Sequence, residues 1–90
     1  MKTIYKYVLE VEDSQFLELP KGAEIISVIA QRGQIVLYAM VDTATVEKES
    51  FQIEVYGTGH KIRHENDFTF LGTVVFEGGD LVFHVFWKKN

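Results

Sequence analysis

Apolar and polar residues alternate along most of the chain, and β-branched and aromatic residues are concentrated in the alternating stretches. A period of two is typical of β-strands, whose successive side chains point to opposite faces of a sheet. No stretch keeps the period of 3.6 residues that marks an amphipathic helix. The alternation predicts strands at residues 4–11, 16–19, 24–31, 34–42, 51–55, 68–77 and 81–88, with a polar loop at 42–50 and an irregular segment at 56–67.

Glycine and proline mark the connections between these strands. The pair Arg32-Gly33 joins two apolar runs, and a two-residue connection that ends in glycine predicts a tight hairpin. Residues 78–80 (Gly-Gly-Asp) predict a second hairpin, and Pro20 ends the strand before it because proline donates no hydrogen bond to a neighbouring strand. Residues 1–90 are therefore expected to form a single all-β domain, a small antiparallel sandwich or barrel of about six or seven strands.

Two of the predicted strands are apolar on both faces, whereas a soluble antiparallel sheet usually exposes one polar face. The second apolar face is either covered by loops folded over a curved barrel, or it contacts a ligand or another subunit, because large exposed apolar patches are rare on soluble monomers. We predict a homo-oligomer, with a dimer favoured. The residues predicted for its interface, from which it would use some, are Tyr38 and Met40 on strand 34–42 and Val82 and Phe86 on strand 81–88.

Charge and composition narrow the classes of function. The 90 residues carry 13 acidic and 9 basic side chains, for a formal net charge of −4, and include no cysteine. The lack of cysteine excludes disulfide bonds and thiolate metal sites, and the acidic balance argues against a nucleic-acid-binding protein. No apolar run approaches the roughly 20 residues of a membrane span. A reducing compartment fits the lack of cysteine, and we expect no membrane segment and no cofactor.

Residues 56–61, Tyr-Gly-Thr-Gly-His-Lys, form the strongest candidate ligand site. Backbone N–H groups beside two glycines can form a concave nest for an anion, to which polar side chains would add donors. The alternative is a glycine-rich strand exit before an exposed loop. A histidine on the apolar strand 81–88 is either a hydrogen-bonded structural residue or part of a pocket or interface. The predicted ligand-binding residues are Gly57, Thr58, Gly59, His60, Lys61 and His84.

The chain shows no constellation typical of catalysis or of a metal site. None of its serines lies in a Gly-x-Ser-x-Gly context. His60 and His64 are four residues apart, a spacing that brings metal ligands together on a helix, but the pattern predicts no helix there. The carboxylates nearest to them, Glu65 and Asp67, belong to the same loop. We therefore expect a binding protein rather than an enzyme, and no metal site.

Several segments of the chain match a known pattern: residues 4–7 (Ile-Tyr-Lys-Tyr), 18–23 (Glu-Leu-Pro-Lys-Gly-Ala), 56–60 (Tyr-Gly-Thr-Gly-His) and 82–86 (Val-Phe-His-Val-Phe). Through these segments, which are spread over nearly the whole chain, the sequence resembles a family of short proteins of unknown function encoded by bacteriophages and prophages. Relatives often carry a tryptophan where this chain has Tyr38. The resemblance implies no established activity, but it implies a small accessory protein in the cytoplasm of an infected bacterium.

Small accessory proteins of phages often act by binding a host factor or by sequestering a defence signal. The resemblance therefore favours a phage protein that inhibits or sequesters a host component. The partner would be a host protein or an anionic small molecule. The alternatives are a ligand-binding protein for a nucleotide or another phosphorylated small molecule, and a minor virion protein.

Overall fold

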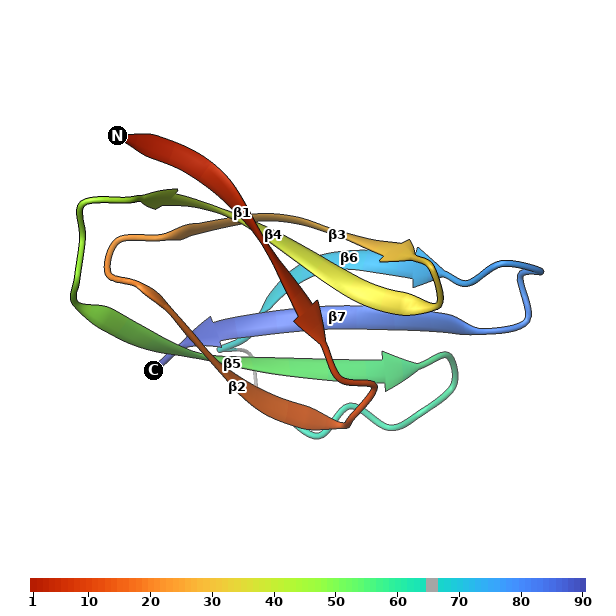
Figure 1. Ribbon diagram of the computed structural model, residues 1–90. Coiled ribbons are helices and arrows are strands. Elements are labelled where there is room, and N and C mark those ends of the chain that lie inside the picture. Colours follow the sequence, from red (N-terminus) through yellow and green to blue (C-terminus); the bar gives the residue numbers. More distant parts are fainter. Residues whose placement is uncertain (65–66) are drawn as a thin grey trace.

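The polypeptide forms seven β-strands, and no helix is present among residues 1–64 and 67–90, which the computed structural model describes. The strands are β1 (Lys2–Leu9), β2 (Ser14–Pro20), β3 (Glu24–Gln31), β4 (Gln34–Asp42), β5 (Lys48–Gly57), β6 (Thr69–Val75) and β7 (Val82–Lys89), as Figure 1 shows. The all-β prediction is confirmed.

The strands form two antiparallel sheets that pack face to face. The first sheet has the order β1-β4-β3 and the second the order β2-β5-β7-β6. The chain passes between the sheets at residues 10–13, 21–23 and 43–47. Along one side β3 lies against β6, where a Cβ on Gly72 would lie 3.0 Å from Cγ1 of Val28. The fold is therefore an open sandwich, the first of the two predicted forms, and not a closed barrel.

The β3–β4 hairpin has the boundaries that the sequence predicts. Arg32 and Gly33 have φ values of 51° and 75°. Two consecutive residues in the left-handed region are what a tight type I′ hairpin turn requires, because its twist matches that of the flanking strands. Glycine adopts this conformation freely, whereas arginine does so only under strain.

Strand β5 is longer at both ends than the prediction of 51–55. At its start Ser50 pairs with Glu18 of β2, and at its end Gly57 pairs with Phe83 of β7. The polar residues 48–50 join the strand because a neighbouring strand satisfies their backbone groups, which local alternation does not reveal. The ends of β1, β2, β6 and β7 differ from the predicted ones by only one or two residues.

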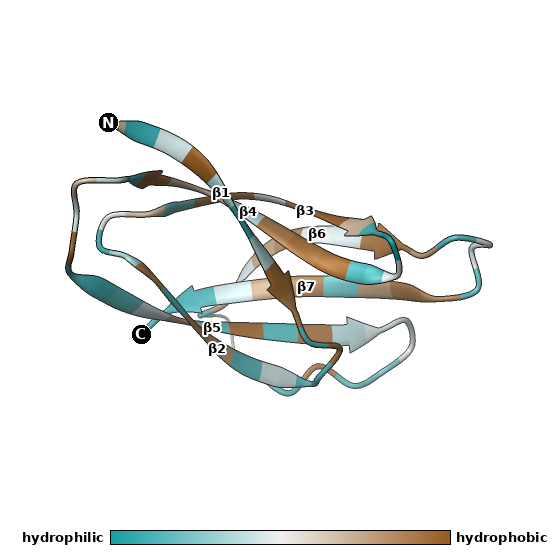
Figure 2. Cartoon of the chain, viewed as in Figure 1, coloured by the Kyte–Doolittle hydropathy of each residue, from teal (hydrophilic) through white to brown (hydrophobic). Residues whose placement is uncertain are grey.

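The core lies between the sheets and is centred on β4 and β5. One of the two apolar faces of β4 is buried, and it meets the inner face of β5 and one residue of β7. Burying each large apolar side chain contributes about 1.5–3 kcal/mol. Figure 2 shows apolar segments in both sheets. The central buried residues are Ile35, Leu37, Ala39, Val41, Phe51, Ile53, Val55 and Val85.

The outer faces of the two sheets carry different halves of the predicted interface. Tyr38 and Met40 lie on the outer face of the three-stranded sheet, because the neighbouring β4 positions point into the core. Val82 and Phe86 lie on the outer face of the four-stranded sheet, where the Phe86 ring contacts His64 at 5.0 Å between centroids. A single planar contact therefore cannot contain all four residues, and the dimer itself stays a prediction.

Candidate functional site

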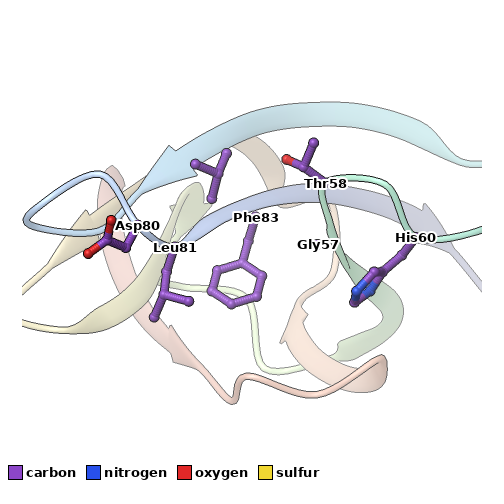
Figure 3. A pocket seen from close by; sticks show the side chains of 7 residues that line it. Gly57, Thr58, His60, Asp80, Leu81 and Phe83 are labelled. Atoms are coloured by element: carbon purple, nitrogen blue, oxygen red, sulfur yellow. The ribbon is translucent and has the colours of Figure 1, made fainter.

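A pocket of about 430 Å³ opens at the end of the sandwich where β5 ends and the β6–β7 hairpin turns. Register pairing places Gly57 beside Phe83, so the exit of β5 and the start of β7 form its two sides. In Figure 3 Asp80 and His60 lie on opposite sides of the pocket, with Phe83 between them. The lining residues are Gly57, Thr58, His60, Asp80, Leu81, Val82 and Phe83.

His60 reaches the pocket because Gly57 has no side chain. A Cβ built on Gly57 would lie 3.0 Å from Cε1 of the His60 ring, closer than nearly all real contacts of that kind. The backbone between them makes a turn, in which the His60 N–H donates to the Gly57 carbonyl at 3.1 Å and Gly59 has a φ of +87°. That N–H is therefore used inside the turn and does not point to a bound anion.

His84 supports the pocket from behind rather than lining it. Its Nε2 atom lies 2.8 Å from Oγ1 of Thr58, and its Nδ1 atom lies 2.9 Å from Oγ1 of Thr73 on β6. Both ring nitrogens are thus occupied by hydroxyl groups, one of which belongs to the pocket. This arrangement fixes Thr58 against β7, and it is the hydrogen-bonded arrangement expected of a structural histidine.

Three of the six predicted ligand-binding residues line the pocket: Gly57, Thr58 and His60. His84 contacts one of them, whereas Gly59 and Lys61 are exposed and are not among the lining residues. The sequence missed the other side of the pocket, which Asp80 and residues 81–83 provide. Asp80 was assigned to a hairpin turn and residues 81–83 to a strand, with Val82 predicted for the subunit interface. No local signal reveals that the register of β5 on β7 brings them beside Gly57.

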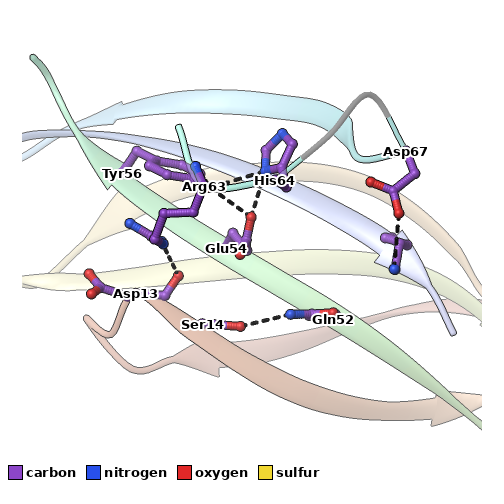
Figure 4. A network of polar contacts seen from close by, with 9 residues as sticks. Asp13, Ser14, Gln52, Glu54, Tyr56, Arg63, His64 and Asp67 are labelled. Carbon is purple, nitrogen blue, oxygen red and sulfur yellow. Dashed lines mark hydrogen bonds and ion pairs between the residues drawn. The ribbon is translucent and has the colours of Figure 1, made fainter. Parts of the chain in front are cut away.

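A buried cluster of polar side chains lies on the outer face of the four-stranded sheet, beside the pocket segment (Figure 4). The Tyr56 hydroxyl donates to Oε1 of Glu54 at 2.7 Å, and Nδ1 of His64 lies 2.5 Å from the same oxygen. The hydroxyl also lies 3.0 Å from His64 Nδ1 and accepts the Arg63 N–H at 3.1 Å. Glu54 is 6% exposed and Tyr56 1%, so the outer face of β5 is buried at both positions although Glu54 is charged.

This cluster anchors the connection between β5 and β6 to the sheet. The His64 ring stacks on Phe68 at 4.4 Å between centroids. The Arg63 guanidinium lies 4.2 Å from the centroid of the Tyr56 ring and donates to the Asp13 carbonyl at 2.9 Å. Burial raises the pKa of Tyr56, as expected for a phenol removed from water. Arg63, His64 and Phe68 of the connection therefore lie over the sheet, a few residues after the pocket segment.

From the sequence, His64 was weighed as a metal ligand together with His60, Tyr56 only as the first residue of segment 56–61, and Glu54 was not singled out. Glu65, which it placed near the two histidines, lies outside the described residues. Within residues 1–64 and 67–90, no group of three or more histidine, aspartate or glutamate side chains is placed to hold a metal ion. The same part of the chain contains no helix that could cross a membrane.

Comparison with known proteins gives the chain a family. No curated protein and no solved structure matches it. One family model, described as a domain of unknown function (DUF7352), matches residues 1–90. Because the match extends over the whole chain, this protein belongs to the DUF7352 family.

Proposed function

We propose that this protein acts by binding, and that its ligand is a small molecule with an apolar body and a protonated amine, held in the pocket at the end of β5. The pocket volume of about 430 Å³ falls within the range of ordinary ligand sites, about 300–1,000 Å³. Such sites combine a mostly apolar lining with a few polar groups that fix orientation. Leu81, Val82 and Phe83 are the apolar lining here, and Thr58, His60 and Asp80 are the polar groups.

The Asp80 carboxylate is the observation that carries the choice of an amine. Asp80 is the acidic residue among those that line the pocket. Apart from His60, the other lining residues are neutral. A cationic group near Asp80 would gain about 1 kcal/mol at an exposed separation of about 4 Å. An apolar body attached to it would lie on Phe83 and Leu81.

The anionic ligand expected from the sequence is the rival to this proposal. Two features oppose it. The His60 N–H, one of the donors of the expected nest, is bonded within the turn, and Asp80 would repel an anion. The net charge of −4 adds a general repulsion.

The setting in a phage-infected cell rests on the sequence resemblance alone and stays a prediction, as does inhibition of a host protein. Binding of a small ligand fits the sequestering form of that prediction best. A pocket without an attached reaction centre is sufficient for sequestration, because only affinity and protein concentration matter.

The proposal is tested by titrating the protein with three probes, namely phenethylammonium, 3-phenylpropionate and inorganic phosphate. Binding of each probe is measured by ligand-observed NMR. Fragments of this size bind with a Kd on the order of 1–10 mM. We expect phenethylammonium to bind about fivefold more tightly than phenylpropionate. The variant Asp80→Asn should abolish that preference, whereas Asp67→Asn, which makes the same change of charge at the opposite end of β7, should keep it.

Equal binding of phenethylammonium and phenylpropionate by the unmodified protein would contradict the role of Asp80. Binding of phosphate or phenylpropionate in preference to the amine would contradict the cationic ligand and return the site to the anion-binding prediction. A loss of preference in Asp67→Asn as well would assign the effect to net charge and not to the pocket.

A further inference from the structure

The outer face of the three-stranded sheet carries an exposed apolar patch, far from the elements that line the pocket. Its exposed aliphatic side chains are Ile4 (56%) and Val8 (49%) on β1, and Ile26 (44%) and Ile29 (41%) on β3. Tyr38 and Met40 of β4 lie between these strands. Together with Tyr38 and Met40, which are partly exposed, these four side chains form a patch on the order of a few hundred Å². Apolar patches of this size on soluble proteins are often functional.

The charged residues at the two edges of this face differ in sign, and the central strand adds Asp42, which lies in one row with Lys2 and binds the N-terminal ammonium at 3.2 Å. The lysines Lys2 and Lys6 lie on β1, at one edge of the sheet, and Glu24 lies on β3, at the other edge. The register places Ile4, Met40 and Glu24 in one row across the sheet, and Lys6, Tyr38 and Ser27 in the next row. Within the described residues no ion pair involves Lys6 or Glu24. Beyond the row of Lys2 and Asp42, the face therefore has a positive edge, an apolar centre and a negative edge.

We propose that this face binds a second copy of the same chain in a two-fold symmetric dimer. A two-fold axis that runs parallel to β4 between two such faces lays β4 on β4 and places β1 of each copy opposite β3 of the other. Lys6 of one copy then lies opposite Ser27 of the other and one row away from Glu24, within reach of a long lysine side chain, and this contact occurs twice. Tyr38, Met40 and the four aliphatic residues become buried. The self-complementary order of charge is what selects a second copy as the occupant, because a partner of uniform charge would be repelled by one of the two edges.

The proposal does not depend on the ligand pocket, which lies at an end of the sandwich. It is tested by sedimentation equilibrium of the full chain at about 1–100 μM, a range that spans ordinary dimer affinities. The unmodified protein should sediment as a dimer of the 10.3-kDa chain. Val8→Glu should raise the dimer dissociation constant about a hundredfold or more, because it buries an unpaired carboxylate twice.

Val75→Glu is the matched control, since Val75 is 55% exposed on the outer edge strand of the other sheet. It should fold and dimerise like the unmodified protein. The charge reversals give a second, independent readout. Lys6→Glu and Glu24→Lys should each weaken the dimer, and the double variant should restore it, because the reversed charges again face each other across the interface.

A monomer for the unmodified protein at about 100 μM would overturn the proposal. A dimer that survives Val8→Glu would place the contact on another surface, and the same would follow if Val75→Glu disrupted it equally. Failure of the double variant to restore the dimer would reject the arrangement of β1 opposite β3. Capture of a different protein by this face, with a monomeric free chain, would assign the patch to a foreign partner instead.

Discussion

Replacement of Tyr56 by phenylalanine tests whether the buried cluster holds the β5–β6 connection on the sheet. The substitution keeps the aromatic ring and removes a hydroxyl that donates to Glu54 at 2.7 Å and accepts the Arg63 N–H at 3.1 Å. Because Tyr56 is 1% exposed, water does not easily take the place of the lost group. Glu54 would remain buried with His64 as its nearest donor.

The magnitude follows from the kind of bond that is lost. A hydrogen bond to a charged group contributes about 1.5–3 kcal/mol to folding, and the exposed Arg63 N–H adds little because water can reach it. We expect Tyr56→Phe to lower the free energy of unfolding by about 2–3 kcal/mol. This is a large part of the total free energy of unfolding of a small domain, about 5–10 kcal/mol. For a domain of this size the corresponding fall in Tm is about 10–20 °C.

The assay is thermal and urea unfolding followed by circular dichroism, with Tyr5→Phe as the control. The Tyr5 ring is half-exposed on β1, and the described part of the chain offers its hydroxyl no hydrogen-bond partner. The control should change stability by less than about 0.5 kcal/mol. A second readout is cleavage by trypsin after Lys61 and Arg63, which should be faster in Tyr56→Phe than in Tyr5→Phe because the connection is released from the sheet.

A loss below about 0.5 kcal/mol in Tyr56→Phe, together with unchanged cleavage, would refute the reasoning. The cluster would then be a consequence of the fold and not one of its supports. A loss of stability with unchanged cleavage would mean that the hydroxyl stabilises the sheet alone and does not anchor the connection.

Three further predictions concern other parts of the fold. Gly72→Ala should lower stability by about 1–3 kcal/mol in urea unfolding, because its Cβ would lie 3.0 Å from Val28 across the junction of the sheets; an unchanged midpoint would show that the junction is loose. Arg32→Asn should raise stability by about 0.5–1 kcal/mol, because asparagine tolerates the φ of 51° better than arginine; a lower Tm would contradict this. The hydrogen bond from Lys88 lowers the pKa of Asp67 below its usual 3.8, so its contribution to stability is present above that pH and lost as the pH falls through the lowered value. Thermal melts between pH 5 and pH 2 should therefore show a smaller acid-induced loss in Asp67→Asn, and an identical loss in both proteins would disprove the linkage.

Sequence reasoning succeeded where the determinants are local. The β3–β4 hairpin is defined by the alternation of apolar and polar residues and by the two-residue turn that ends in glycine. Both signals lie within a few residues of the strand ends that they predict. The features that the sequence did not predict depend on pairing between strands that are far apart in the chain. Residues 48–50, for example, belong to β5 because they pair with β2.

The candidate site was predictable only in half, for the same reason. Gly57, Thr58 and His60 belong to one continuous segment whose composition is unusual, so the sequence singles them out. Asp80 reaches the pocket only through the register of β7 on β5, and it changes the ligand that the geometry favours from an anion to a cation. Glu54 alternates with apolar residues like any exposed strand residue, and its burial depends on a connection that folds back over it.

The central claim, a ligand pocket between the end of β5 and the start of β7, is tested most directly by a ¹H–¹⁵N correlation titration of the full chain with phenethylammonium up to about 10 mM. The account predicts that the amide shifts are concentrated at Gly57, Thr58, His60 and residues 80–83. Asp80→Asn should raise the Kd taken from these shifts about fivefold, whereas Asp67→Asn should leave it unchanged. Shifts concentrated on β1, β4 and β3, or no shifts at all, would contradict it.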